Sequence, residues 1–477
     1  MTKIGFAGAA VLMVLSGFSS SARADGNDWP MYNYDAVGSR NNGSESVLNL
    51  WTVPRLRQVW KTTTAAPVTG TPIVVAGKVF AGDWSGAFYR LNATNGHIDW
   101  TAHAVAPVSA SALVVSDKVV FGDQAGFIYG LDKTTGAVKW QIQPNNHPFA
   151  AIFASPTPVG SYVALGVAST EEDAAADPSY ACCSFRGSVV LLDPTNGHVV
   201  WHTYLITAAE RALGASGAAV WSSVTYDEDS DLLYVTTGNN YSNPATLKSD
   251  AIIALDARTG AIRWSSQQIP NDVSNFTYPI EPDKDSDFGD SAQIYRLSNG
   301  RKVVGAGDKN GIYFVLDAAT GQKINENQVQ TGGSLGGLFA DSAVSCGVIF
   351  ANGADWADPF DFSVLPHEGL LTALSGDAQH VLWQKHTPNS VNLGGVSVAN
   401  SVVYFASCNP GVGDRLSGDP GTLYAVNALT GATLAAKPLD HCSTSGPAIS
   451  NGKVFVGVGN EFLFAGSPAG SIVSFGL

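Results

Sequence analysis

Long hydrophobic runs and basic residues are both scarce in this 477-residue chain. Beyond its first residues, no stretch reaches the roughly 18 apolar residues, free of charges and turns, that a membrane span needs. Lys and Arg number 26 against 40 Asp and Glu, so the formal net charge is -14. We therefore expect no membrane span, and an acidic surface disfavours nucleic acid and anionic lipid as partners.

Two cofactor motifs are missing as well. No Gly-x-Gly-x-x-Gly follows a strand and opens a helix, which argues against a nicotinamide site of the Rossmann type. None of the five cysteines begins a Cys-x-x-Cys-His motif, which argues against a covalent c-type haem in this chain. Long apolar patterns with a helical period are also absent. Together with 51 glycines and many Asn and Asp turns, this predicts a nearly all-β fold.

The first residues look like a targeting segment. A short apolar run at residues 4–17 follows Lys3, and Ala-Arg-Ala at residues 22–24 has the small-x-small pattern of a cleavage site. We expect residues 1–24 to be a secretory signal peptide. The mature chain would then begin near Asp25 and be periplasmic.

What the chain has in abundance is a repeat. A phrase of the form Leu-Asp-x-x-Thr-Gly-x-x-x-Trp recurs, with variations, seven times. Each copy places an apolar strand on either side of a tight turn, which is typical of a β-hairpin. Such a small sheet cannot bury both faces alone, so the copies must stack, and a radial stack of sheets is a β-propeller. The copies begin at Leu91, Leu131, Leu192, Leu255, Leu316, Leu374 and Val426.

An eighth blade is expected from pairing the two ends of the repeat region. The early segment around Gln58, Val59 and Trp60 has strand character, and so does the last segment, residues 471–475. Pairing them closes the ring. We therefore predict residues 25–477 to be a single eight-bladed β-propeller domain.

The cysteines leave several pairings open. Cys182 and Cys183 are adjacent, and neighbouring Cα atoms lie only about 3.8 Å apart, whereas ordinary disulfides span about 4.4–6.8 Å. From the residues alone, both thiols can be free, each can pair elsewhere, or the two can form a strained ring. Cys408 and Cys442 are spaced to pair across one blade, which leaves Cys346 unpaired.

The repeat and the adjacent cysteines together resemble the alcohol dehydrogenases that depend on pyrroloquinoline quinone (PQQ). In that family, eight-bladed propellers carry a Trp-docking repeat and a disulfide between adjacent cysteines that stacks on the quinone. Residues 28–32 (Asp-Trp-Pro-Met-Tyr) and 182–188 (Cys-Cys-Ser-Phe-Arg-Gly-Ser) look most like the polyvinyl alcohol dehydrogenase branch. The resemblance implies a Cys182–Cys183 disulfide packed on the quinone.

The resemblance also assigns Trp221 and Asn239. Family members place a tryptophan under the quinone ring, eighteen residues before a Gly-Asn whose Asn binds calcium. Trp221 stands eighteen residues before Asn239 in this chain. Without the family, Trp221 would be interpreted as a core residue and Asn239 as a turn residue.

Asp287 and Lys309 are the implied catalytic pair. The Asp-rich segment 285–289 looks like the loop that carries the family's catalytic aspartate, and Asp287 matches best. In the three Gly-Asp-x-x-Gly turns, the residue after Asp is Trp84, Gln124 and Lys309, so only the third copy is basic. The family places Arg or Lys there, over the reactive carbonyl. The alternatives are a solvated acidic loop and a surface lysine.

Glu171 completes the implied metal set, with its neighbour Glu172 as the alternative. Calcium seeks oxygen ligands, and Glu171, Asn239 and Asp287 offer them. An inserted loop, residues 173–184, separates this glutamate from Arg186, unlike the better-known alcohol dehydrogenases. Arg186 would face a quinone carboxylate, since a planar guanidinium suits that contact.

The resemblance implies an enzyme that oxidises alcohol groups, secondary ones on a polymer-like chain above all, by hydride transfer to PQQ. Asp287 would take the alcohol proton, Lys309 would stabilise the developing oxyanion, and a separate cytochrome c would accept the electrons. Calcium is favoured over a rare-earth ion because Gly289 stands where an extra aspartate would be expected. Two alternatives are a non-catalytic propeller scaffold and a propeller that binds a small ligand.

Overall fold

The computed structural model describes residues 27–275, 286–333, 336–355, 368–409, 420–460 and 470–477. The predicted signal peptide and Asp285 lie outside these residues. The described chain is nearly all β, as predicted. Its helical segments are short: η1 (Val53–Arg55), α1 (Glu171–Ala174) and α2 (Ala208–Ala212). No helix in these segments is both long and apolar enough to cross a membrane.

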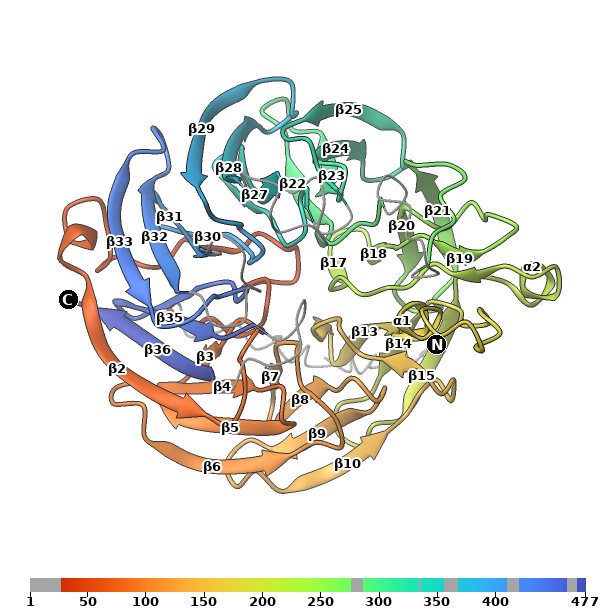
Figure 1. The fold of residues 1–477 in the computed structure, drawn as a ribbon, viewed down its shortest axis with the longest axis horizontal. Coiled ribbons are helices and arrows are strands. Elements are labelled where there is room, and N and C mark those ends of the chain that lie inside the picture. The colour runs from red at the N-terminus through yellow and green to blue at the C-terminus, as the bar shows by residue number, and fades with distance from the viewer. Residues whose placement is uncertain (1–26, 276–285, 334–335, 356–367, 410–419, 461–469) are drawn as a thin grey trace, which may run out of the picture.

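Eight antiparallel sheets surround a central axis, so the predicted eight-bladed propeller is confirmed (Figure 1). Blade 1 consists of β3 (Ile73–Val75), β4 (Lys78–Gly82), β5 (Ala87–Asn92) and β6 (Ile98–His103), and blade 2 of β7 (Leu113–Val115), β8 (Lys118–Gly122), β9 (Ile128–Asp132) and β10 (Val138–Ile142). Blade 3 consists of β11 (Ala150–Ala151), β12 (Thr157–Val159), β13 (Tyr162–Ser169), β14 (Ser188–Leu192) and β15 (Val199–Tyr204), and blade 4 of β17 (Thr225–Asp227), β18 (Leu232–Thr236), β20 (Ala251–Asp256) and β21 (Ile262–Gln267).

The second half of the ring repeats this plan. Blade 5 consists of β22 (Gln293–Arg296), β23 (Lys302–Gly307), β24 (Ile312–Asp317) and β25 (Lys323–Gln328), and blade 6 of β26 (Ala343–Ser345), β27 (Val348–Asp355), β28 (Glu368–Ser375) and β29 (Val381–Pro388). Blade 7 consists of β30 (Ser397–Ala399), β31 (Val402–Cys408), β32 (Gly421–Asn427) and β33 (Thr433–Leu439), with β1 (Asn41–Asn42) added at its inner edge. A two-stranded ribbon, β16 (Ser216–Gly217) with β19 (Asn240–Ser242), stands outside the blades.

Blade 8 closes the ring from both ends of the chain. Its strands are β34 (Ala448–Ser450), β35 (Lys453–Val458), β36 (Gly470–Gly476) and the early strand β2 (Arg57–Thr64). β2 runs antiparallel to β36, with Gln58 opposite Phe475 and Trp60 opposite Ser474. The predicted closure is therefore confirmed: strands from both ends of the chain form one blade.

The repeated tryptophans join each blade to the next. The Trp140 indole N–H donates to the Pro194 carbonyl of the following blade at 2.8 Å. Gly197, in the turn of that blade, has φ +75°, and a Cβ there would lie 2.7 Å from the Trp140 ring. The Thr-Gly or Asn-Gly turn is thus needed for its positive φ and for the close approach of an indole. The same approach recurs at Trp60–Gly96, Trp100–Gly136, Trp201–Gly260, Trp264–Gly321 and Trp383–Gly431.

The hydrophobic core is divided among the interfaces between blades. Leu191 of blade 3, for example, packs in one buried cluster with Leu233 and Leu255 of blade 4. Strands in the middle of a blade, such as β14, are buried along their whole length, whereas outermost strands such as β21 alternate between more and less exposed positions. The blades surround a central axis, so the segments that connect successive blades come close to one another there although they are far apart in the sequence.

Candidate active site

Three of the predicted site residues meet at one carboxylate. Asp287 Oδ1 accepts a hydrogen bond from the Asn239 backbone N–H at 2.7 Å, and Asp287 Oδ2 lies 3.4 Å from Lys309 Nζ. Both charged side chains are more than nine-tenths buried. Gly238 makes this approach possible, because a Cβ there would lie 3.0 Å from Asp287 Oδ2. This close approach is a steric reason for glycine at position 238, directly before Asn239.

The turn that holds Lys309 is a repeated backbone frame. The Lys309 N–H donates to the Asp287 carbonyl at 2.9 Å. In blades 1 and 2, the equivalent bonds run from Trp84 to Pro67 and from Gln124 to Pro107. The same backbone hydrogen bond therefore brings positions 287 and 309 together in blade 5. Of these three turns, only the one in blade 5 places an acid beside a base.

Trp221 lies beside this pair. Lys309 Nζ is 5.5 Å from the centre of the Trp221 ring and 5.8 Å from that of Phe339. The two rings are 5.5 Å apart at their centres. Gly289 passes so close that a Cβ there would lie 2.6 Å from the Trp221 ring and 2.1 Å from the Phe339 carbonyl. A side chain at position 289, an aspartate included, is therefore excluded by packing.

Glu171 sits at the start of α1 and is fully buried. Its Oε1 accepts hydrogen bonds from the Tyr180 hydroxyl at 2.7 Å and the Ser184 N–H at 2.8 Å, and its Oε2 accepts from the Phe185 N–H at 2.7 Å. Burial raises the pKa of Glu171, but these donors and His147 outweigh burial and bring the pKa to about 2. Glu171 is thus an anion that anchors the inserted loop.

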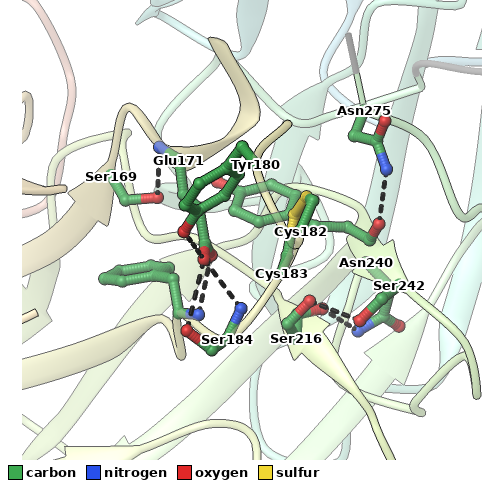
Figure 2. Close-up of a disulfide and its surroundings, with 12 residues drawn as sticks. Ser169, Glu171, Tyr180, Cys182, Cys183, Ser184, Ser216, Asn240, Ser242 and Asn275 are labelled. Atoms are coloured by element: carbon green, nitrogen blue, oxygen red, sulfur yellow. Dashed lines mark hydrogen bonds between the residues drawn. A yellow bond between two sulfur atoms is a disulfide. The ribbon is translucent and has the colours of Figure 1, made fainter. Parts of the chain in front are cut away.

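The inserted loop carries the disulfide that the family resemblance predicted. Cys182 and Cys183 are bonded to each other, Cys408 is bonded to Cys442, and Cys346 is free and exposed. Figure 2 shows the Cys182–Cys183 bridge between the Glu171 anchor on one side and the β16–β19 ribbon, with Ser216 and Asn240, on the other.

Backbone bonds connect the disulfide loop to the Asn239 segment. The Gly187 N–H donates to the Gly217 carbonyl and the Gly217 N–H donates to the Phe185 carbonyl, both at 2.9 Å. Gly217 in turn pairs with Asn240 within the ribbon. Cys183 and Trp221 also pack against the same buried cluster, which includes Tyr241. The disulfide and Trp221 therefore border one region of the core.

Tyr241 lies close enough to both Glu171 and Asp287 for their charges to affect its pKa. It is fully buried, and burial raises its pKa well above the usual range. The negative charges of Glu172, Asp287 and Glu171 add to that rise. Glu171 is buried completely, while Glu172 is only half-buried.

Arg186 is directed differently from its predicted role. Its guanidinium carbon lies 4.0 Å from the centre of the Tyr204 ring, and Nη1 donates to the Ile206 carbonyl at 3.3 Å. These contacts place the side chain against β15 and the segment that follows it. Its assignment to a quinone carboxylate stays a prediction.

Asp272 is a site residue that the sequence did not single out. It is buried, its Oδ2 accepts from the Ser286 N–H at 2.9 Å, and its carbonyl accepts from the Asn240 N–H at 3.3 Å. Burial raises the pKa of Asp272 to about 6, and the charge of Asp287 adds to the rise. Asp272 therefore ties the Asp287 segment to the Asn239 segment. Neither Asp272 nor Phe339 lies in a repeat, and both were missed for that reason.

The oxygen atoms at this site suit a hard cation. Asn239 is fully buried and its Oδ1 has no hydrogen-bond donor among the described residues, whereas its Nδ2 donates to the Ser274 carbonyl at 2.8 Å. A buried acceptor without a donor is costly unless a cation or water meets it. No group of three or more His, Cys, Asp or Glu side chains in the described segments forms a metal site by itself. Any such site here would depend on the Asn239 amide oxygen.

Comparisons with known proteins agree with this architecture. Residues 186–337 match the family described as the glucose/ethanol/alcohol dehydrogenase β-propeller domain, and residues 56–165 match the family described as outer membrane protein assembly factor BamB. A solved quinohemoprotein alcohol dehydrogenase, ADHIIG of Pseudomonas putida HK5, has a TM-score of 0.73 and 17% identity over 95% of this chain and 80% of its own. At that identity the likeness shows the fold.

Two sequence relatives carry the resemblance further. The polyvinylalcohol dehydrogenase of Sphingopyxis sp. (strain 113P3) is 29% identical over 65% of this chain and 52% of its own length. That of Pseudomonas sp. is 26% identical over 60% and 49%, respectively. The chain thus spans about half the length of these curated relatives. The resemblance predicted from the sequence is confirmed: this chain is similar to PQQ-dependent alcohol dehydrogenases in sequence and in fold.

Proposed function

We propose that this chain is a PQQ-dependent dehydrogenase that oxidises alcohol groups. The observation that carries the proposal is the Asp287 carboxylate, buried between the Asn239 N–H and Lys309 Nζ and next to Trp221. An acid and a base at hydrogen-bonding range beside an aromatic surface provide a proton acceptor and an electrostatic partner in one place.

The residues of this chain would hold two groups. Glu171, Asn239 and Asp287 would bind calcium, and Glu171 Oε2 has one described donor, which leaves a lone pair for an ion. Trp221 and the Cys182–Cys183 bridge would enclose PQQ, and Arg186 would face one of its carboxylates. When bound, PQQ supplies the two-electron acceptor and calcium polarises it.

The side chains would accept a proton and stabilise charge during the reaction. Asp287 would accept the proton of the alcohol hydroxyl, because it is a carboxylate whose Oδ1 is fixed by a backbone N–H. Lys309 would orient Asp287 Oδ2 and stabilise negative charge that develops beside it. Asp272 would keep the loop in register, because it holds the N–H that precedes Asp287. Phe339 and Trp221 would exclude water from the pair.

The finer parts of the proposal concern substrate, partner and location. Two relatives named polyvinylalcohol dehydrogenase favour secondary hydroxyl groups on a long or bulky chain as substrate. The absence of a Cys-x-x-Cys-His motif in this chain favours a separate cytochrome c as the electron acceptor. The predicted signal peptide favours the periplasm.

Reconstitution tests the enzyme and the cofactors together. The purified chain would be loaded with PQQ and Ca²⁺ and assayed for dye reduction with secondary alcohols and polyvinyl alcohol, and with NAD as a negative control. We expect dye reduction that a calcium chelator abolishes, and an increased calcium requirement in Asn239→Ala. Asn196→Ala, in a surface turn, is the matched control. Activity that survives exhaustive chelation contradicts the calcium assignment.

A scaffold role is the second candidate, favoured by the match of residues 56–165 to the BamB family. A scaffold requires neither a buried amide oxygen without a described donor at Asn239 nor a Lys309–Asp287 pair. Saturable PQQ binding with no dye reduction across a broad alcohol panel would favour a binding role. No PQQ binding at all would favour the scaffold.

A further inference from the structure

One buried carboxylate is bonded to the chain on both sides of the adjacent cysteines. Glu171 Oε1 accepts hydrogen bonds from the Tyr180 hydroxyl at 2.7 Å and from the Ser184 N–H at 2.8 Å. Its Oε2 accepts from the Phe185 N–H at 2.7 Å. Tyr180 precedes the two cysteines in the chain, whereas Ser184 follows them, and Figure 2 shows their bonds converging on the carboxylate beside the disulfide. Glu171 therefore fixes both ends of the segment that carries the disulfide.

His147 reaches the same carboxylate from the connection between blades 2 and 3. Its Nε2 lies 3.0 Å from Ser184 Oγ and 3.5 Å from Glu171 Oε1. Its Nδ1 accepts the Phe149 N–H at 3.3 Å, so the proton of a neutral ring belongs on Nε2, which can donate to either oxygen. The His147 ring also lies edge-on against Phe185, with 5.5 Å between the ring centres. His147 thus supplies a donor from outside the inserted loop.

The inserted loop, residues 173–184, has few other anchors in the described chain. Most of its residues before the cysteines are exposed, and both cysteines are half-buried. After α1 and as far as Cys182, the backbone N–H groups that bond to other backbone groups do so within α1 and the loop. One ring contact adds to these turns, between Tyr180 and Phe149, whose centres are 5.3 Å apart. The position of the loop therefore depends largely on the donors to Glu171.

We propose that these contacts form a latch that holds the inserted loop closed, with Glu171 at its centre and Tyr180 and His147 as positioning residues. The latch deepens the proposed function and rests on it, because Glu171 is also the proposed calcium ligand. Oε1 serves the loop, while Oε2 has one described donor and keeps a lone pair for the ion. One carboxylate thus joins the loop that carries the disulfide to the metal site.

Loop closure and cation binding favour each other in this arrangement. The donors to Oε1 keep the Glu171 carboxylate ionised and fix its orientation, as hydrogen bonds around metal ligands commonly do. A cation on Oε2 in turn favours the ionised carboxylate, which is the stronger acceptor for the Tyr180 and Ser184 hydrogen bonds. Because such coupling is reciprocal, a change that weakens the latch weakens cation binding, and removal of the cation loosens the loop.

Reduction of the disulfide tests the latch without cofactor or turnover. The full chain would be treated with a water-soluble phosphine, and the thiols released from the adjacent cysteines would be counted by alkylation and mass spectrometry. The fully buried Cys408–Cys442 bridge is the internal reference. Tyr180→Phe removes one donor to Glu171 and should speed reduction of the adjacent bridge about 10-fold or more. Tyr162→Phe, at the exposed start of β13, is the matched control and should keep the wild-type rate.

A second variant and a second measurement keep the test independent of Tyr180→Phe. His147→Ala should also speed reduction, whereas His147→Gln, which keeps an N–H donor near Ser184, should retain part of the protection. Amide hydrogen exchange of the wild-type chain needs no variant, and the Ser184 and Phe185 N–H groups should exchange more slowly than those of the exposed part of the loop. Equal reduction rates in the wild-type chain and both loss-of-donor variants, or equally fast exchange throughout the loop, overturn the latch.

Calcium separates the latch from the enzyme proposal. With saturating PQQ in both samples, calcium at about ten times its dissociation constant should slow reduction of the adjacent bridge up to about 10-fold relative to a chelator. An unchanged rate, in a chain whose dye reduction requires calcium, overturns the coupling and leaves the enzyme proposal intact. Faster reduction in Tyr180→Phe, in a chain that reduces no dye, supports the latch and counts against the enzyme proposal.

Discussion

Blade 5 and blades 1 and 2 use the same turn in opposite ways. In all three, a buried aspartate begins the turn: Asp83, Asp123 or Asp308. In blades 1 and 2 this aspartate is a structural acceptor, since Asp123 Oδ2 accepts from the Tyr129 hydroxyl at 2.7 Å and from the Ala106 N–H at 3.2 Å. Tyr89 and Ala66 do the same for Asp83.

In blade 5 both of those donors are missing. Phe314 stands where Tyr129 stands in blade 2, and the Ser286 N–H donates to Asp272 instead. Asp308 keeps the Ile312 N–H at 3.0 Å. Burial raises the pKa of Asp308 to about 8 because the remaining donors do not offset it. Blade 5 thus departs from the repeat, because its buried Asp308 has fewer hydrogen-bond donors than Asp83 and Asp123. The same blade carries Asp287 and Lys309.

The largest expected effect comes from neutralising Asp287. Asp287→Asn keeps an oxygen for the Asn239 N–H but removes the proton acceptor, so kcat of the reconstituted chain should fall about 10²- to 10⁴-fold. Asp317→Asn, at the end of β24 in the same blade and remote from the Asp287–Lys309 pair in the repeat, is the control. Retained turnover with quinone bound would contradict the assignment of Asp287.

Lys309→Gln makes blade 5 match blade 2, where Gln124 occupies this position. Removing one charged donor beside the reacting centre should lower kcat about 10²- to 10³-fold while the melting temperature changes little. The reciprocal change, Gln124→Lys, should leave activity unchanged, because Pro107 offers no carboxylate there. A loss of fold rather than of rate in Lys309→Gln, seen by circular dichroism, would instead make Lys309 a structural residue.

Removing the structural donor in blade 2 should affect stability alone. Tyr129→Phe leaves Asp123 with one donor fewer and the Val105 N–H without its acceptor, so the free energy of unfolding should fall by about 1–3 kcal/mol. Urea titration measures this change, and turnover should stay at the wild-type value. An unchanged midpoint would mean that water replaces the hydroxyl.

Restoring the donor in blade 5 is the smallest and the most specific test. Between pH 3.8 and about 8 the folded chain holds a proton on Asp308 that the unfolded chain has released, so this carboxyl lowers stability as pH rises through that window. Phe314→Tyr should lower the pKa of Asp308 and make the chain more stable by about 0.5–1.5 kcal/mol at pH 8, and by less at pH 5. A gain that is equal at both pH values would show that the hydroxyl does not reach Asp308.

The sequence predicted well what depends on local repetition. The Thr-Gly turns and end-strand tryptophans specify hairpins and the contact of each blade with the next, because Gly197 must have a positive φ and must pass an indole closely. The pairing of the segment around Gln58 with residues 471–475 at closure followed from the same strand pattern, whereas its register came from the structure. Family spacing selected Trp221, Asn239, Asp287 and Lys309, and the structure brings these four together.

Only the tertiary structure revealed the partners of those residues. That Asp287 occupies the place of Pro67 and Pro107, or that Asp272 holds its loop, depends on connections that meet at the axis from chain positions far apart. Such contacts have no period, since each connection is a different length and sequence. By itself, then, the sequence determined the number of blades, their closure and the candidate residues. The convergence of inner loops decided which acid faces which base, because burial and hydrogen bonding at the axis exist only after the ring has closed.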